Sequence, residues 1–248
     1  MTASRASAYS PPPSKGIYTT TLAELMAASI TLAPEAPRQA DLFQDEDEDR
    51  STRLYCAGDR SLIERPRVAI IGTRDPSSAG AGRARRLARE LAGAGVVVVS
   101  GLAKGIDTEA LAAAIEAAGR VIAVIGTPLD RAYPGENKRL QERIYHEHLL
   151  ISQFAPGQRV FQRNFPVRNR LMAALSDATV IVEAGESSGT FHQAVACERL
   201  GRWLFIARTV ADDPHLRWPA DFIGKPRVRV LNATTDILTE LPPPRQIR

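Results

Sequence analysis

The sequence predicts an α/β fold: a mostly parallel, doubly wound, Rossmann-like sheet with helices on both faces. The predicted strands are rich in Val and Ile without alternation of apolar and polar residues, which is typical of strands buried on both faces. Helix-like segments lie between most of these strands, and such alternation favours a parallel sheet. The chain has 248 residues, enough for one large domain or two small ones.

The regular elements begin near Leu54. Strand-like runs occupy 67–72, 96–100, 120–126, 149–152, 178–183, 203–207 and 228–231. Helix-like segments occupy 80–93, 105–118, 136–147, 166–176 and 188–200. In the first of these helices, Leu87 and Leu91 share one face while arginines surround the others, as expected for a helix that packs on one side only.

Composition divides the chain into three parts. We expect residues 1–50 to be mostly disordered, because prolines interrupt them and Asp45 to Asp49 form an unbroken acidic run. Within this segment, Leu22 to Ile30 have the pattern of a short helix. We expect residues 51–240 to form the Rossmann-like domain and residues 241–248 to form a Pro-rich tail.

Charge is distributed unevenly along the chain. Residues 1–50 contain four Lys/Arg against eight Asp/Glu, a net charge of −4, and the remainder contains 28 against 20, a net charge of +8. A basic body behind an acidic segment favours a polyanionic partner, although a merely basic housekeeping domain has the same balance. With such a partner, we expect the acidic run to compete weakly for the basic body.

Several common chemistries lack their sequence signatures. Cys56, Cys197 and the four histidines have no metal-ligand spacing, and no Walker A lysine, G-x-G-x-x-G or G-x-S-x-G motif is present. Asp107 and Glu183 could act as general bases, but a helix cap or structural hydrogen bond is favoured. We therefore expect no metal, no cofactor and no catalytic residue. The aliphatic runs are too short to span a bilayer and residues 1–14 lack a secretory signal, so we expect a cytoplasmic protein.

Three separated stretches have the residue types of phosphate-binding turns. The first two, 72–74 and 100–107, each lie between a predicted strand and a predicted helix, where free backbone N–H groups and the helix dipole favour an anion. The third, 165–170, adds two guanidiniums and an aromatic ring, and 188–190 opens a further helix at the same sheet edge. The candidate phosphate-binding residues are Gly72, Thr73, Arg74, Ser100, Gly101, Lys104, Gly105, Phe165, Arg168, Asn169, Arg170, Ser188, Gly189 and Thr190.

Each candidate has a structural alternative. Arg74 is placed for bidentate bonds to phosphate or for a surface salt bridge. The glycine-rich turns could be tight turns without a ligand. Phe165 could stack on a base or only pack against the start of its helix. Arg168 and Arg170 lie two residues apart on a predicted helix and project to different sides, so one can meet phosphate while the other braces the fold.

Seven short motifs occur in order: GTRDPS, VVSGLAKGIDTEAL, LDRAYPGEN, LLIS, FPVRNRLMAALS, VIVEAGESSGT and GRWLF. In this order and spacing they resemble the DNA-processing protein A family (DprA, also called Smf), from about Leu54 to Ala207 and more weakly at Asp236 to Leu238. The resemblance implies a Rossmann-like domain that binds and protects single-stranded DNA. It also implies a homodimer that loads a RecA-type recombinase during natural transformation and recombination, with Arg74, SGLAKGID and FPVRNR lining the DNA groove.

The chain departs from the family pattern at several places. Thr108 to Leu111 lack a histidine that usually follows the GID turn, and Gln153 replaces a glutamate. Arg208 to Asp213 replace a Pro-Gly turn, near the region that family members use for self-association. The family's helical N-terminal domain and C-terminal winged helix have no counterpart in this sequence, so we expect a minimal or specialised member.

A second class of function stays open as the alternative. The same superfamily includes phosphoribohydrolases and sensors of nucleotide-derived ligands. The matching loop of this chain, AGESSGTFHQA, lacks the Pro-Gly-Gly of the hydrolases. This difference argues against hydrolysis but not against nucleotide sensing.

Overall fold

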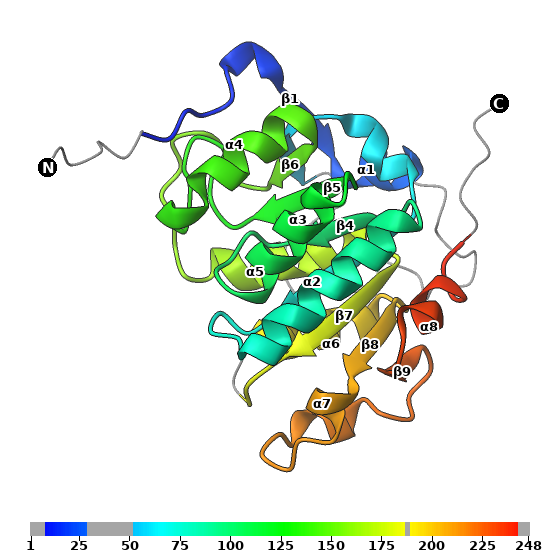
Figure 1. Cartoon of the computed structure of the whole chain (residues 1–248). Coiled ribbons are helices and arrows are strands. Elements are labelled where there is room, and N and C mark those ends of the chain that lie inside the picture. Colours follow the sequence, from blue (N-terminus) through cyan, green and yellow to red (C-terminus); the bar gives the residue numbers. More distant parts are fainter. Residues whose placement is uncertain (1–7, 29–51, 187–188, 243–248) are drawn as a thin grey trace, which may run out of the picture.

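A nine-stranded sheet forms the centre of the computed structural model, which describes residues 8–28, 52–186 and 189–242 (Figure 1). The strands are β1 (Ile17–Thr21), β2 (Arg53–Gly58), β3 (Arg67–Gly72), β4 (Val97–Ser100), β5 (Val121–Ile125), β6 (Leu149–Ser152), β7 (Ala178–Glu183), β8 (Trp203–Ala207) and β9 (Val228–Leu231). Their order is β1-β2-β6-β5-β4-β3-β7-β8-β9. From β6 to β9 all neighbours are parallel, whereas β2 is antiparallel to both β6 and β1. The predicted mostly parallel α/β sheet is confirmed.

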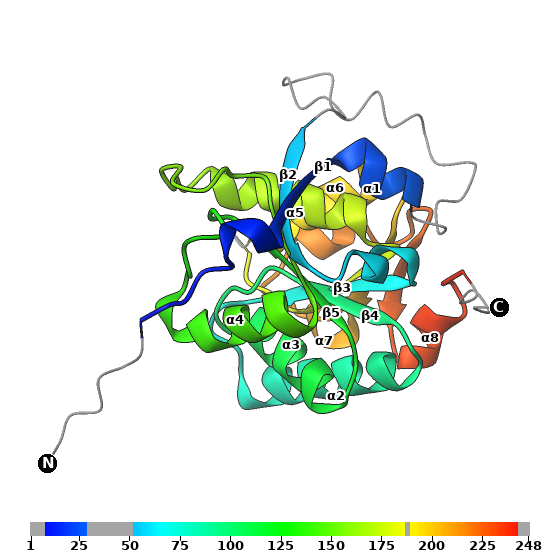
Figure 2. The same cartoon turned by 90° about the horizontal axis from the view of Figure 1, so that it is seen from above.

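Helices cover both faces of the sheet, which lies between them in Figure 2. One face carries α2 (Ser78–Gly93), α3 (Ile106–Glu116), α4 (Lys138–Glu147) and α8 (Thr234–Leu238). The other carries α1 (Leu22–Ala28), α5 (Asn164–Leu175), α6 (Gly189–Arg199) and α7 (Arg208–Ala211). Short 3-10 helices are η1 (Ser14–Gly16), η3 (Arg60–Glu64), η4 (Gly135–Asn137) and η5 (Trp218–Asp221). Within the described ranges, no helix is long and apolar enough to cross a membrane.

Neighbouring residues of one strand face opposite cores, which explains the unbroken Val and Ile runs. In β4, Val97 and Val99 belong to the core shared with α5 and α6, whereas Val98 packs with α2 and α3. In β3, Ile71 lies on the first side and Ile70 on the second. These strands are therefore buried on both faces, as the sequence predicts.

Residues 8–28 pack against the domain, so the expectation of disorder is wrong for this part of the N-terminal segment. The strand β1 pairs with β2, and α1, which falls within the predicted helix 22–30, buries Leu25 completely. The Tyr9 hydroxyl donates to the backbone oxygen of Leu129 (2.7 Å) and accepts from Gln141 Nε2 (2.8 Å). All these partners lie far away in sequence, so local composition could not predict them. The acidic run 45–49 lies outside the described residues.

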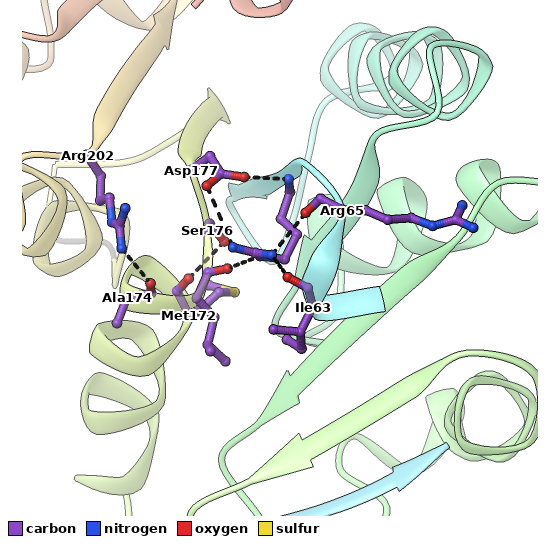
Figure 3. A network of polar contacts seen from close by, with 9 residues as sticks. Ile63, Arg65, Met172, Ala174, Ser176, Asp177 and Arg202 are labelled. Carbon is purple, nitrogen blue, oxygen red and sulfur yellow. Dashed lines mark hydrogen bonds and ion pairs between the residues drawn. The ribbon is translucent and has the colours of Figure 1, made fainter. Parts of the chain in front are cut away.

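A buried polar network joins the amino ends of β3 and β7 (Figure 3). Arg67, which begins β3, is 2% exposed, and its backbone N–H donates to Asp177 Oδ2 (2.7 Å) while its guanidinium lies 3.6 Å from Asp177 Oδ1. The guanidinium also donates to the backbone oxygens of Leu175 (2.5 Å) and Arg65 (2.9 Å). Burial lowers the pKa of Arg67, and the Asp177 charge opposes that change. The network fixes β3 beside β7 at the end of the sheet opposite to their carboxyl ends.

Candidate functional site

A cavity of about 570 Å³ lies at the carboxyl end of β3. Here the strand order reverses, because the chain runs outward from β3 through β4, β5 and β6 and returns to the other side of β3 as β7. Open α/β sheets bind their ligands at such a position. The cavity is lined by Ile71, Gly72, Thr73, Arg74, Ala103, Asp107, Tyr133, Gln162, Phe165, Pro166, Arg168, Asn169, Met172, Gly189 and Thr190. Four segments that the sequence predicted to share one edge therefore meet around one hollow.

The first two predicted turns interlock through their backbones. Gly105 has φ +83°, and a Cβ there would collide with the backbone of Thr73 and Arg74. The N–H of Ile106 donates to the Thr73 oxygen (3.2 Å), and the Thr73 N–H donates to the Glu183 oxygen at the end of β7 (2.8 Å). The glycine is thus required by the contact between the two turns. This contact fixes where the next residue, Arg74, leaves the sheet edge.

Arg74 presents an exposed guanidinium beside aromatic rings. Its Cζ lies 5.8 Å from the centroid of the Phe165 ring, within the range of a cation–π contact. Across the described part of the chain, this guanidinium has no hydrogen-bond or ion-pair partner. The Tyr133 ring lies 5.5 Å from Phe165 and is 52% exposed. The cavity therefore combines the Arg74 guanidinium, which has no polar partner among the described residues, with the aromatic rings of Phe165 and Tyr133.

Arg168 lines the cavity but braces the fold. It is 5% exposed, and its Nη1 donates to the backbone oxygens of Gly101 and Val124, the latter at 2.9 Å. Its Nε donates to Asn169 Oδ1 (2.9 Å). A Cβ on Gly101 would collide with this guanidinium, which explains the glycine. Arg168 therefore braces the fold, one of the two roles that the sequence left open, because its Nη1 holds the carboxyl ends of β4 and β5. Its contact with phosphate stays a prediction.

Five described residues of the predicted set do not line the cavity: the two turn glycines, Gly101 and Gly105, and three residues with side chains, Ser100, Lys104 and Arg170. The Ser100 hydroxyl is buried and donates to the Ile70 oxygen (2.7 Å), so it ties β4 to β3. Arg170 lines a different hollow, beside Leu54 on the α1 side, since residues two apart on a helix face different directions. Lys104 is exposed at the tip of its turn and does not line the cavity. Ser188 lies outside the described residues.

Both carboxylates of this region accept hydrogen bonds from backbone N–H groups. Asp107 accepts from the N–H groups of Gly101 (3.1 Å) and Ala103 (3.3 Å); burial raises its pKa and nearby Arg168 opposes that rise. Glu183 accepts from the N–H (2.8 Å) and hydroxyl (2.7 Å) of Ser77, the cap of α2, and pairs with Arg83 (3.2 Å). These contacts match the predicted structural roles. Among the described residues, no group of His, Cys, Asp or Glu is arranged to hold a metal ion.

Sequence reasoning missed a second aromatic group next to the cavity. Phe161 is 40% exposed, and the guanidinium carbons of Arg159 and Arg163 lie 5.4 and 5.0 Å from its ring centroid. Phe161 adjoins Gln162, which lines the cavity. The interleaving of arginine and aromatic residues in QRVFQRNF was the available signal.

The family model for DNA recombination-mediator protein A matches residues 33–242. The chain belongs to this family. It is 42% identical over 151 residues to DNA processing protein DprA of Streptococcus pneumoniae, covering 61% of this chain and 52% of that protein. It is 32% identical over 222 residues to DprA of Bacillus subtilis, covering 89% and 74%. This family member thus spans about half the length of the pneumococcal relative.

Solved structures of the same family share this fold. DprA of S. pneumoniae superposes with a TM-score of 0.71 at 35% identity, covering 78% of this chain and 68% of that one. DNA processing protein A of Helicobacter pylori gives 0.69 at 30% identity, covering 84% and 93%, and its structure was described for a unique single-stranded DNA binding mode. A molybdenum cofactor binding protein of Rippkaea orientalis, 13% identical with a TM-score of 0.53, shares the fold alone.

Proposed function

We propose that this chain binds and protects single-stranded DNA in the cavity at the carboxyl end of β3 and helps to load a RecA-type recombinase in natural transformation or recombination. One observation carries the DNA-binding part: the uncommitted guanidinium of Arg74 lies against Phe165, with exposed Tyr133 beside it. Guanidiniums suit phosphates, and aromatic faces suit unpaired bases. The H. pylori relative described for single-stranded DNA binding supports the same ligand class.

The roles of the lining residues follow from their geometry. Arg74 contacts a backbone phosphate as a bidentate donor. Gly189 and Thr190 begin α6 on the cavity wall, where N–H groups at the start of the helix add donors for the same or the next phosphate. Asn169 holds this helix start, since its Nδ2 donates to the Gly189 oxygen (3.2 Å). A base of the strand stacks on Tyr133 or Phe165.

This arrangement favours single strands over duplex. Stacking on a protein ring needs a base whose face is free, and paired bases in a duplex offer none along the strand. Phosphate and ring contacts carry little sequence information, so we expect weak dependence on base sequence. Affinity falls as salt rises, because bound cations of the DNA are released when arginines replace them.

Replacing Arg74 tests the site. We expect Arg74→Ala to weaken binding of labelled oligo-dT by about 1.5–3 kcal/mol, the contribution of a charged hydrogen bond. Fluorescence anisotropy gives the affinity. Arg143→Ala is the matched control, since Arg143 is also exposed but pairs with Glu147 on α4 (3.0 Å), outside the cavity. Equal affinity of Arg74→Ala and the wild type would contradict the assignment.

The proposal also covers the oligomeric state, the site of action and the choice between a binding protein and an enzyme. The family membership supports a homodimer, a cytoplasmic site of action and a binding protein rather than an enzyme. Sedimentation velocity tests the homodimer, and a strand-exchange assay with a RecA-type recombinase tests loading.

The alternative function is that of a nucleotide sensor, for which a cavity of about 570 Å³ has a suitable size. Tight binding of a mononucleotide without binding of oligo-dT would replace DNA with that ligand.

A further inference from the structure

A second cavity, of about 410 Å³, lies at the carboxyl ends of β7, β8 and β9. It is lined by Arg83, Arg86, Leu87, Glu90, Val182, Ala207, Arg208, Thr209, Leu231, Asn232, Ala233 and Thr234. The lining comes from α2, the start of α7 and the turn between β9 and α8. Figure 1 shows α7 at the end of β8, below the crossing of α2 over the sheet.

The lining contains three arginines and a single carboxylate, Glu90, which already accepts a hydrogen bond from Thr234. Two of the arginines have carboxylate partners, since Arg83 pairs with Glu183 and Arg208 with Asp212. Arg86 is exposed and has no hydrogen-bond or ion-pair partner in the described ranges. Arg86 is therefore the cation that the wall of this cavity offers to an incoming anion.

Arg208 is held in position at the opposite wall. Its Nε and Nη2 donate to Asn232 Oδ1 (2.9 and 2.6 Å), and its Nη1 lies 3.6 Å from Asp212. Arg208 begins α7, so it stands at the carboxyl end of β8 on the wall of this cavity.

Both cavities flank the end of β7. The Glu183 backbone oxygen accepts from Thr73, which lines the first cavity, and the Glu183 carboxylate pairs with Arg83, which lines the second. Ile71 of the first cavity belongs to the core beside α5, and Val182 of the second belongs to the core beside α2. The two hollows thus lie on opposite sides of one sheet edge, with Glu183 between them.

We infer that the second cavity binds a phosphate group, and specifically a later phosphate of the same single strand that occupies the first cavity. This inference rests on the proposed function. A strand that leaves Arg74 crosses the sheet edge beside Glu183 and reaches Arg86 and Arg208. The same phosphate chemistry would also hold a free nucleotide, so the experiment must separate the two sources.

The test compares oligonucleotides of two lengths. For oligo-dT of about 20 nucleotides, we expect Arg86→Ala to lower affinity about tenfold and to make the salt slope less steep by about 0.7. For oligo-dT of about 4 nucleotides, which fills only the first cavity, we expect no change. Arg89→Ala is the matched control: Arg89 lies on the same helix, is 51% exposed and pairs with Glu116 (3.5 Å), outside the cavity.

Each outcome has a distinct meaning. Equal affinity of Arg86→Ala and Arg89→Ala for the long oligonucleotide overturns the inference. Stabilisation of the protein against heat by dTMP that depends on Arg86, without a length effect, assigns the cavity to a free nucleotide and also overturns it. If Arg74→Ala leaves the affinity for both oligonucleotides unchanged while Arg86→Ala lowers the affinity for the long one, the first cavity is not the DNA site and the proposed function is overturned. Phosphate binding in the second cavity then still stands. Arg208→Lys, which keeps the charge but loses the forked contacts to Asn232, gives an intermediate loss.

Discussion

At the residue scale, the surroundings of each arginine decide what its guanidinium does. Arg74 and Arg168 line the same cavity. Arg74 is exposed and has only a ring beside it, whereas Arg168 is buried, and its Nε and Nη1 donate to Asn169 and to backbone oxygens. Burial lowers the pKa of Arg168 and the Asp107 charge opposes this, so the pair belongs to the folded framework. Binding and stability therefore depend on different arginines of one site.

Stability measurements separate these two roles. We expect Arg168→Ala to reduce the free energy of unfolding by about 3–5 kcal/mol, because it leaves Asp107 buried without its counter-charge. We expect Arg74→Ala to change it by less than about 0.5 kcal/mol, since Arg74 is an exposed surface residue. Urea denaturation followed by circular dichroism gives both values. An Arg168→Ala protein as stable as the wild type would return Arg168 to the set of phosphate ligands.

Sequence patterns predicted the positions of the site's turns better than the directions of their side chains. Gly72, Arg74 and Phe165 line the cavity as expected, because their places at strand or helix ends follow from the backbone pattern. Ser100 and Arg170 do not, because the direction of a side chain depends on neighbours that are distant in sequence. The same reason accounts for the omission of Tyr133, whose ring meets Phe165 only in the folded chain.

At the element scale, β3 and β7 are joined at both ends. The Arg67–Asp177 network holds their amino ends, and the hydrogen bond from Thr73 to Glu183 holds their carboxyl ends beside the cavity. These two strands flank the point where the strand order reverses. Their relative position therefore sets the shape of the cavity.

A double-mutant cycle tests the buried network. Arg67→Met removes the guanidinium that pairs with buried Asp177, and we expect a loss of about 3–5 kcal/mol. Adding Asp177→Asn should recover part of this loss, because the carboxylate that has lost this partner is then neutral. The recovery stays incomplete, because buried Arg202 also loses the Asp177 charge, which raises its pKa. Thermal and urea unfolding of the three variants give the coupling. Additive losses would show that the two side chains act independently.

The strands and the longer helices from β3 onward were predictable, whereas the short helices α7 and α8 and the edge strands β1 and β2 were not. Each of the seven predicted strands and five predicted helices agrees with the structure to within two residues at either end, because buried parallel strands and one-sided helices have strong periodic patterns. The strands β1 and β2 were missed. They pair antiparallel at one edge, where short mixed sequences carry little periodicity and the pairing is with distant segments.

At the scale of the whole molecule, two arginine-lined cavities lie where the parallel strands end. The net charge of +8 beyond residue 50 supplies a general attraction for polyanions. Both basic cavities open at the carboxyl edge of the sheet, one on each side of the end of β7. A ligand that spans them must carry several phosphates in a row. Single-stranded DNA meets that requirement, and a mononucleotide meets it only in part.

The most direct test of this account is a comparison of ligands across salt concentrations by fluorescence anisotropy. We predict that the protein binds long oligo-dT more tightly than duplex of equal length, and either more tightly than dTMP. The logarithm of its affinity for oligo-dT should fall linearly with the logarithm of salt, with a slope of about −2 to −4, or about −0.7 for each phosphate that is neutralised. Tight binding of dTMP with a shallow salt slope, together with no binding of oligo-dT, would contradict the account.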